Sequence, residues 1–418
     1  MTANETDPRS ARPAPATNAA RRRRRLQRVL LLCVSSLVAL GLAEAVLRQV
    51  EKSSFGDHAT TEETFLTDAV LKHRVKPFTL GHDARGFRND SVPERADVVA
   101  LGDSQTWGVN VEREQAWPQE LGRLTNRRVY NMSLGGYGPV QYWTLTDEAL
   151  TLRPRTLVVG LYFGNDLYDA YAMAYQYDAH APLRRPDAPA DIADDTVGRR
   201  AEEYWNHERA FTYDYGARGA GGWDDWLRGH TAIGRRLDRA GLWPSPVNLQ
   251  HKIGRAWAER HPERGAVFEG EGAARTVFTI AYRQAAVDLS EPRIVEGLRI
   301  TKELLTRINV KAEASGARLL VLLIPTKESA YADVLRERGA RLHETHEKLI
   351  RQEAAARAEI QAMCERERIV CADALPRLSE AVRSGARVYS QSAESHPHAS
   401  GYALISAVVC DELARRGW

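Results

Sequence analysis

The chain is poor in cysteine, with four in 418 residues. Cys33 lies in an apolar run near the N-terminus, whereas Cys364, Cys371 and Cys410 lie far downstream. None of their spacings resembles the paired ligands of a zinc site. A Cys364–Cys371 disulfide and three buried thiols are both compatible with these positions. We therefore expect no metal site and no cofactor.

The sequence also lacks a strong charge of one sign, because 58 basic residues face 55 acidic ones. The excess is concentrated at the N-terminus, where residues 1–50 hold nine Arg against three acidic residues. Nucleic-acid-binding proteins carry a basic face. A nucleic-acid role therefore has no support outside the N-terminus.

Long apolar runs are missing except at residues 29–47, where Glu44 is the one charged interruption. This length of roughly 19 residues is close to what a helix needs to cross a bilayer. Arg21 to Arg25 and Arg28 precede the run, and positive charge on one side of an apolar span keeps that side in the cytoplasm. We expect a single-pass anchor with a cytoplasmic N-terminus and an exported remainder, in the periplasm or at the cell surface. A cleaved signal peptide is the alternative, since Ala43-Glu44-Ala45 has the form of a cleavage site.

Five short apolar runs lie at 97–101, 128–131, 156–163, 318–324 and 368–372. They are continuous rather than alternating, as expected of strands covered by helices on both faces. Helical patterns lie at 298–312, 342–363 and 402–416. The sequence thus predicts an α/β fold, a three-layer α/β/α sandwich with a parallel sheet of about five strands.

The predicted segments are a disordered basic tail at 1–25, the transmembrane anchor at 26–47, a lead-in segment at 48–95 and a domain at 96–418. An insertion at about 171–295 interrupts this domain. It is rich in Tyr, Trp, Arg, Asp and Gly, shows no obvious buried strand, and is longer than a connection needs. We interpret it as a helical cap beside the site; a loosely packed surface excursion is the alternative.

Three short motifs follow predicted strands, and a parallel sheet brings its C-terminal strand ends to one edge. In chain order they are Gly102-Asp103-Ser104, Gly136 in a glycine-rich turn, and Gly164-Asn165-Asp166, with His396-Pro397 as a fourth motif near the C-terminus. A serine hydroxyl is a weak nucleophile and needs a base within hydrogen-bond reach. The four motifs together indicate a serine esterase site with Ser104 as nucleophile and His396 as base.

These motifs resemble the four blocks of the SGNH hydrolases, also called GDSL esterases. Residues 102–108, Gly-Asp-Ser-Gln-Thr-Trp-Gly, match the nucleophile block, and 131–138 resemble the second block, although Ser133 stands where relatives often have Gly. The resemblance implies that the N–H groups of Ser104 and Gly136 and the side-chain amide of Asn165 form an oxyanion hole. Residues 396–402 resemble the fourth block, with His398 at the usual Asn position.

The triad acid departs from the family pattern. Most relatives carry Asp three residues before the histidine, where this chain has Ala393. Glu394 is the one carboxylate close by, and a spacing of two also occurs in the alginate O-acetyltransferase-like branch. We expect Glu394 to orient His396; a surface carboxylate, with the histidine held by a backbone carbonyl, is the alternative. His398 is the rival base.

Two further stretches extend the resemblance over nearly the whole chain after residue 80, except the insertion. Residues 82–88 resemble a run that precedes the nucleophile block in membrane-anchored members, and Ile324 to Glu328 resemble their Pro-x-Lys stretch. The resemblance implies a membrane-anchored, extracytoplasmic serine esterase that acts on an acyl ester, acetyl esters included, of a small molecule or a glycan. The alternatives are an O-acyltransferase that modifies an envelope polysaccharide, and a non-catalytic protein that binds a glycan or a protein partner.

Overall fold

The computed structural model describes residues 27–28, 30–32, 34–46, 64–79, 81–212, 231, 233, 254–269, 275–390 and 393–418. The tail predicted at 1–25, Cys33 and the start of the lead-in segment lie outside these residues. In the described part of the chain, no helix combines the length and apolar character that a membrane crossing requires. The transmembrane helix predicted at 26–47 is therefore not found there; residues 26, 29, 33 and 47 of that range are not described.

A five-stranded parallel sheet forms the centre of the fold. Its strands lie in the order β4 (Val129–Ser133), β3 (Val98–Gly102), β5 (Thr156–Tyr162), β8 (Arg318–Ile324) and β9 (Val370–Asp373). Every residue of β3 and β5 is buried, which explains their uninterrupted apolar sequences. All five strands were predicted from the sequence, with small differences at their ends.

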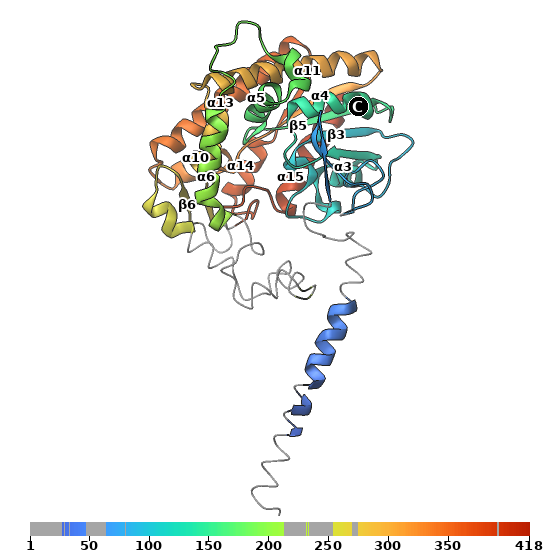
Figure 1. The fold of residues 1–418 in the computed structure, drawn as a ribbon, viewed down its shortest axis with the longest axis vertical. Coiled ribbons are helices and arrows are strands. Elements are labelled where there is room, and N and C mark those ends of the chain that lie inside the picture. The colour runs from blue at the N-terminus through green and yellow to red at the C-terminus, as the bar shows by residue number, and fades with distance from the viewer. Residues whose placement is uncertain are drawn as a thin grey trace, which may run out of the picture.

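Helices cover both faces of the sheet (Figure 1). One layer contains α4 (Pro139–Leu150), α5 (Asp166–Gln176), α11 (Pro292–Ala314) and α13 (Glu344–Arg366). The other contains α3 (Trp117–Thr125) and α15 (Ala399–Arg416), which pack against each other. The predicted three-layer α/β/α sandwich is confirmed.

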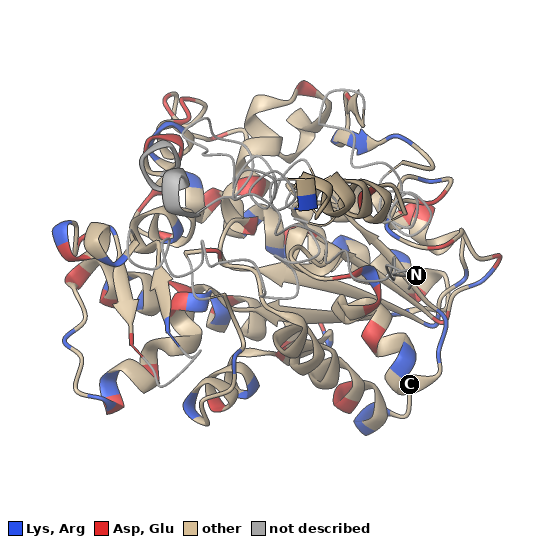
Figure 2. Ribbon diagram, turned by 90° about the horizontal axis from the view of Figure 1, so that it is seen from below, with Lys and Arg blue, Asp and Glu red and all other residues tan. Residues whose placement is uncertain are grey.

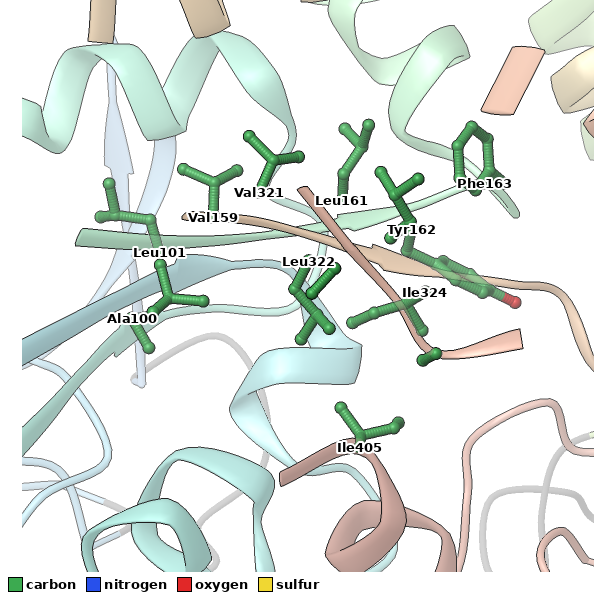
Figure 3. Packing of buried hydrophobic residues seen from close by; sticks show 14 of the residues in the cluster. Ala100, Leu101, Val159, Leu161, Tyr162, Phe163, Val321, Leu322, Ile324 and Ile405 are labelled. Carbon is green, nitrogen blue, oxygen red and sulfur yellow. The ribbon is translucent and has the colours of Figure 1, made fainter. Parts of the chain in front are cut away.

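The hydrophobic core lies on both faces of the sheet, between the strands and the helices that cover them (Figure 3). Val159 and Val321 are neighbours on β5 and β8, and their side chains lie on one side of the sheet. Leu322 and Ile324 lie on the opposite side, toward Ile405 of α15. These side chains are at most 1% exposed, so truncating one of the larger ones to Ala would cost about 2–5 kcal/mol.

The described part of the insertion contains both helices and a β-hairpin. It includes α6 (Thr196–Thr212) and α10 (Ile280–Val287), and the hairpin of β6 (Ala266–Phe268) and β7 (Thr276–Phe278). The absence of a buried strand was predicted wrongly, because β7 is fully buried. Three residues are too few to produce a period that a sequence pattern can show.

Two shorter helices, α12 (Lys327–Glu337) and α14 (Leu375–Arg383), follow β8 and β9. Upstream of the sheet, β1 (Phe65–Asp68) and β2 (Lys72–Val75) form an antiparallel hairpin in the lead-in segment. Two 3-10 helices lie at Arg113–Gln115 and Asp178–Leu183, with three and six residues.

The cysteines of the described chain form no disulfide. The three described cysteines are free; Cys364 is buried, whereas Cys371 and Cys410 are partly exposed. The disulfide alternative is therefore wrong for this structure, and so is the burial of all three thiols.

Lys and Arg residues are interspersed with Asp and Glu over the helices (Figure 2), as in the Arg299–Glu303 ion pair of 2.6 Å on α11.

Candidate active site

Ser104 lies where β3 ends and the short helix α2 (Ser104–Trp107) begins. Asp103 caps this helix, because its carboxylate accepts a hydrogen bond of 2.8 Å from the N–H of Gln105. Gly102 permits the sharp turn: a Cβ at this position would lie 2.1 Å from the Thr106 hydroxyl oxygen. The turn leaves the side chain of Ser104 half-buried at the C-terminal edge of the sheet.

Ser104, His396 and Glu394 form one chain of hydrogen bonds. The Ser104 Oγ and His396 Nε2 are 2.8 Å apart, and His396 Nδ1 lies 2.5 Å from Glu394 Oε1. An ionised carboxylate can only accept, so Nδ1 carries the ring proton and Nε2 is left to accept from the serine hydroxyl. This is the geometry of a nucleophile, a base and an orienting acid.

The spacing of two residues between Glu394 and His396 has a local explanation. Glu394 Oε1 accepts from the backbone N–H of His396 at 3.0 Å as well as from its ring. One carboxylate oxygen therefore fixes both the backbone and the imidazole of the same residue. The loop thus places the Glu394 carboxylate against the imidazole with a spacing of only two residues.

Glu394 is ionised at neutral pH. Burial by itself would raise the pKa of this carboxyl, but the His396 charge and hydrogen bonds, together with the charge of Lys327, lower the pKa to about 2. The side chains of Glu394 and His396 are 12% and 8% exposed. A charge that is so little exposed to solvent stabilises the imidazolium strongly when His396 takes a proton.

Lys327, the first residue of α12, contacts the backbone of the acid residue, Glu394. Its side chain is completely buried, and its Nζ donates to the carbonyl oxygens of Glu394 at 2.9 Å and Val277 at 2.8 Å, and to Thr276 Oγ1 at 3.1 Å. Burial lowers the pKa of Lys327 to about 8, against the opposing effect of Glu328 and Glu394. The Pro-x-Lys stretch thus ties the acid loop to β7 of the insertion.

Arg283 of α10 connects two further parts of the site. Its guanidinium donates to the carbonyl oxygen of Gly164 at 3.1 Å and to the hydroxyl of Ser395 at 2.5 Å. Gly164 precedes Asn165, and Ser395 lies between the acid and the base. A helix of the insertion therefore connects two segments that are far apart in the sequence.

The predicted oxyanion donors lie around the same space. Ser104, Gly136, Asn165 and His396 line one pocket. Among the residues that the structure describes, the backbone N–H groups of Ser104 and Gly136 donate no hydrogen bond. Free N–H groups beside a nucleophile can bind the oxygen of a tetrahedral intermediate.

Asn165 is held by a residue that the sequence analysis missed. Its amide nitrogen donates one hydrogen to Asp169 Oδ2 at 2.5 Å, which leaves the second hydrogen for an oxyanion. Burial raises the pKa of Asp169 to about 7, although Asn165 and Lys72 act in the opposite direction. Asn165 precedes α5 and Asp169 lies four residues later, so helical spacing is the signal that would have found this pair.

The pocket has a volume of about 250 Å³. Its wall combines Tyr162, Tyr168 and Asp169 with side chains from the insertion: Val197 and Ala201 of α6, and Tyr282, Arg283 and Ala286 of α10. The described helices of the insertion therefore lie directly beside the predicted site. Trp257, the tryptophan of the insertion whose side chain the structure describes, packs instead in a small buried cluster with Ala258, Val277 and Ala393.

His398, the rival base, lies elsewhere. It precedes α15, and its backbone N–H donates to Val388 O at 2.9 Å. Burial, with the charges of Arg387 and Lys327, lowers the pKa of His398 to about 4. The structure thus brings together all five residues predicted for the site and leaves His398 outside the hydrogen-bonded chain.

Replacing Asn165 by Ala should lower kcat for a small ester by roughly 10²–10³, the usual cost of one lost oxyanion donor. KM should change little, because the lost hydrogen bond belongs to the transition state. Steady-state kinetics with a melting curve as control would measure this effect. An unchanged kcat in a folded N165A variant would show that Asn165 does not belong to the oxyanion hole.

No family model matches the chain, and no curated protein matches it. Solved structures with some likeness include an extracellular lipase from Streptomyces rimosus, at 12% identity over 77% of this chain and 99% of that chain, with a TM-score of 0.36. A phospholipase A1 from Streptomyces albidoflavus has 11% identity over 77% and 99%, with a TM-score of 0.34. A GDSL-like lipase from Bacteroides thetaiotaomicron has 10% identity over 77% and 89%, with a TM-score of 0.32. Likeness at this level carries no weight for the chemistry, which rests on the geometry of the site.

Proposed function

We propose that the protein is a serine esterase of the SGNH type, which cleaves an acyl ester through an acyl-enzyme on Ser104. The observation that carries this proposal is the hydrogen-bonded chain from Ser104 Oγ through His396 to a buried, ionised Glu394. Burying an ionised carboxylate costs free energy, and binding alone does not require such a charge beside a serine and a histidine. The alternative of a fold retained for binding alone is therefore disfavoured.

Acylation begins when Ser104 Oγ attacks the ester carbonyl carbon. The hydroxyl proton moves to His396 Nε2, and the carbonyl π electrons move to the oxygen, which becomes an oxyanion. The N–H groups of Ser104 and Gly136 and the free amide hydrogen of Asn165 stabilise that charge. When the tetrahedral intermediate collapses, the ester C–O bond breaks and His396 returns the proton to the leaving alcohol.

Deacylation repeats these steps with another acceptor. His396 takes a proton from water, the resulting oxygen nucleophile attacks the acyl carbon, and Ser104 leaves with the proton. A sugar hydroxyl could replace water without any change in these groups, which then would make an acyltransferase. We commit to hydrolysis of an acyl ester, and the pocket of about 250 Å³ beside Ser104 has room for an acetyl group and for longer acyl groups.

Ester hydrolysis by the purified full-length chain in detergent tests this function. The activity should appear with 4-nitrophenyl acetate, as nitrophenolate released in proportion to enzyme. A parallel preparation of a variant with an exposed serine replaced, Ser384→Ala, should behave like the wild type, since Ser384 lies at the end of α14. No release above the buffer rate with acetyl, butyryl or longer esters would contradict the proposal.

We further propose that the N-terminal region anchors the enzyme to a membrane and that the catalytic domain lies outside the cytoplasm. Support comes from the described residues between 27 and 46, which are helical and expose large apolar side chains; Leu31 and Leu32 are 71% and 70% exposed. Water does not favour so many exposed leucines on one helix. The arginines before this helix favour a cytoplasmic N-terminus.

A pair of reporters fused after Trp418 should reveal this topology. Alkaline phosphatase, which folds outside the cytoplasm, should be active, whereas a fluorescent protein that folds in the cytoplasm should remain dark. Deleting residues 1–47 should reverse both results. Cytoplasmic fluorescence from the full-length fusion would contradict the proposed topology without affecting the esterase proposal.

A further inference from the structure

The lead-in hairpin of β1 and β2 makes a direct contact with the predicted oxyanion loop. His73 of β2 lies 62 residues before Gly135, and its Nε2 is 2.9 Å from the Gly135 carbonyl oxygen. A carbonyl oxygen only accepts hydrogen bonds, so Nε2 carries a proton and donates it. Neither the sequence motifs nor the proposed chemistry assigns a task to this histidine.

The hydrogen bond from His73 fixes the peptide that carries an oxyanion donor. The Gly135 carbonyl and the Gly136 N–H belong to one planar trans peptide, in which they point in opposite directions. Because the carbonyl points toward His73, the Gly136 N–H must point away from it. Gly136 has a φ of +77°, a value that glycine adopts as readily as a negative one. Because glycines flank the peptide on both sides, the backbone restricts its rotation little. The peptide therefore needs an external contact to hold one orientation.

The loop lies between His73 and the nucleophile. A Cβ built on Gly135 would be 3.7 Å from the Cβ of Ser104, and a Cβ built on Gly136 would be 3.4 Å from Cε1 of His73. Gly136 also lines the pocket together with Ser104. A Gly136 N–H that points away from His73 is therefore directed to the side on which Ser104 would generate an oxyanion.

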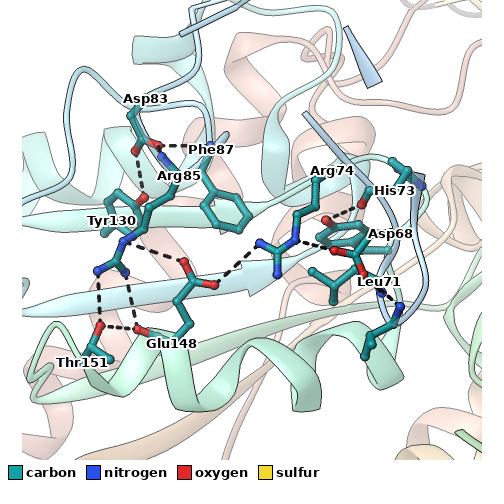
Figure 4. Close-up of polar contacts among 12 residues, drawn as sticks. Asp68, Leu71, His73, Arg74, Asp83, Arg85, Phe87, Tyr130, Glu148 and Thr151 are labelled. Atoms are coloured by element: carbon teal, nitrogen blue, oxygen red, sulfur yellow. Dashed lines mark hydrogen bonds and ion pairs between the residues drawn. The ribbon is translucent and has the colours of Figure 1, made fainter. Parts of the chain in front are cut away.

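His73 is itself held rigidly. Its backbone carbonyl accepts from the Tyr137 hydroxyl at 2.8 Å, and its ring packs against Phe65 and Tyr137 with centroids 5.6 and 5.4 Å apart. The next residue, Arg74, donates to Asp68 at 2.8 Å and lies 3.7 Å from Glu148 of α4 (Figure 4). The hairpin is thus fastened to the helix that follows the oxyanion loop.

We propose that His73 is a positioning residue that orients the Gly135–Gly136 peptide so that the Gly136 N–H can bind the oxyanion. This role rests on the proposed function, since it has a consequence only if Ser104 forms a tetrahedral intermediate. It assigns a purpose to the lead-in hairpin, which supplies part of the catalytic architecture from outside the sheet. Loss of this hydrogen bond would free the peptide to rotate and would weaken binding of the transition state but not of the substrate.

The variants His73→Met and His73→Gln form a matched pair for this test. Their side chains have nearly the same length and shape, but only Gln has an NH₂ group that can donate to the Gly135 carbonyl. In the full-length enzyme, H73M should lower kcat by about 10- to 100-fold, as expected of a misplaced catalytic group, with KM unchanged. H73Q should restore most of the activity. A boronic acid that forms a tetrahedral adduct with Ser104 should bind H73M more weakly by a similar factor.

A melting curve and a second apolar variant distinguish this role from a structural one. His73→Phe keeps an aromatic ring against Phe65 and Tyr137 but has no donor, so it should behave like H73M even if Met disturbs the packing. Equal kcat values for the wild type, H73M and H73F would overturn the proposal, and so would a loss of activity in H73Q as large as in H73M. A wild-type enzyme that neither hydrolyses esters nor binds the boronic acid would instead contradict the proposed function.

Discussion

Ser104→Ala is expected to lose nearly all of the enzyme's ester hydrolysis and to keep only a small residual rate. Without Oγ there is no acyl-enzyme, and the loss of a triad serine costs on the order of 10⁶ in kcat in a serine hydrolase of known mechanism. The fold should remain intact, because the turn at Ser104 depends on Gly102 and on the Asp103 cap rather than on the hydroxyl. Nitrophenolate release and a melting curve on the same sample would measure both properties.

The exposed Ser384→Ala variant is the control for a contaminating esterase, since both proteins are purified in the same way. Wild-type turnover in S104A would mean that another group attacks the ester, and the assignment of Ser104 would be wrong. A residual rate above background would not conflict with it, because oxyanion donors and substrate binding alone accelerate the reaction by roughly 10³ over water.

Glu394→Gln should lower kcat by roughly 10²–10⁴ at neutral pH. Gln has almost the same volume and keeps one oxygen that can accept from His396, but it has no charge to stabilise the imidazolium. KM should change little, because the lost interaction belongs mainly to the transition state. Steady-state kinetics of the wild type and E394Q would measure the change.

The same substitution has a predicted dependence on pH. The pKa of Glu394 is held at about 2, below its ordinary value of 4.5, because His396 and Lys327 outweigh the effect of burial. Its ionised form therefore stabilises the fold above about pH 4.5, and this contribution is lost as the pH falls toward 2. The difference in Tm between wild type and E394Q should shrink over that window.

Two histidine variants separate the assigned base from its neighbour. His396→Ala should be inactive, whereas His398→Ala should retain most of its activity, since His398 precedes α15 and does not contact Ser104 in the described structure. If E394Q behaved like the wild type while H396A was inactive, the enzyme would use a Ser–His dyad. An inactive H398A with an active H396A would show that the wrong base was named.

The sequence predicted those parts of the fold that depend on local patterns. β3, β5 and β8 are uninterrupted apolar runs because helices cover both of their faces, and the motif residues follow these strands directly. Ser104 and Asn165 could be placed at one sheet edge for the same reason, whereas His396 was assigned from the resemblance of residues 396–402 to the fourth block. Glu394 was identifiable because it is so close to His396 in the sequence that a single turn joins them.

Residues whose roles depend on tertiary contacts could not be found in this way. His73 meets Gly135 across 62 residues and Arg283 meets Ser395 across 112, and neither distance leaves a periodic signal. Lys327 was noticed as part of a motif, but its contact with the Glu394 carbonyl requires β8 and the acid loop to meet in space. The buried strand β7 was missed because it is only three residues long.

Labelling with a fluorophosphonate tests the central claim most directly, because the reagent phosphonylates a serine only when a base and an oxyanion hole activate it. The full-length protein should gain the mass of one adduct, and peptide sequencing by mass spectrometry should place that adduct on Ser104. S104A should remain unlabelled, and H396A should react far more slowly than the wild type. An adduct on another serine, or a wild-type protein that stays unlabelled while a known serine esterase in the same tube reacts fully, would contradict the assignment of Ser104 as an activated nucleophile.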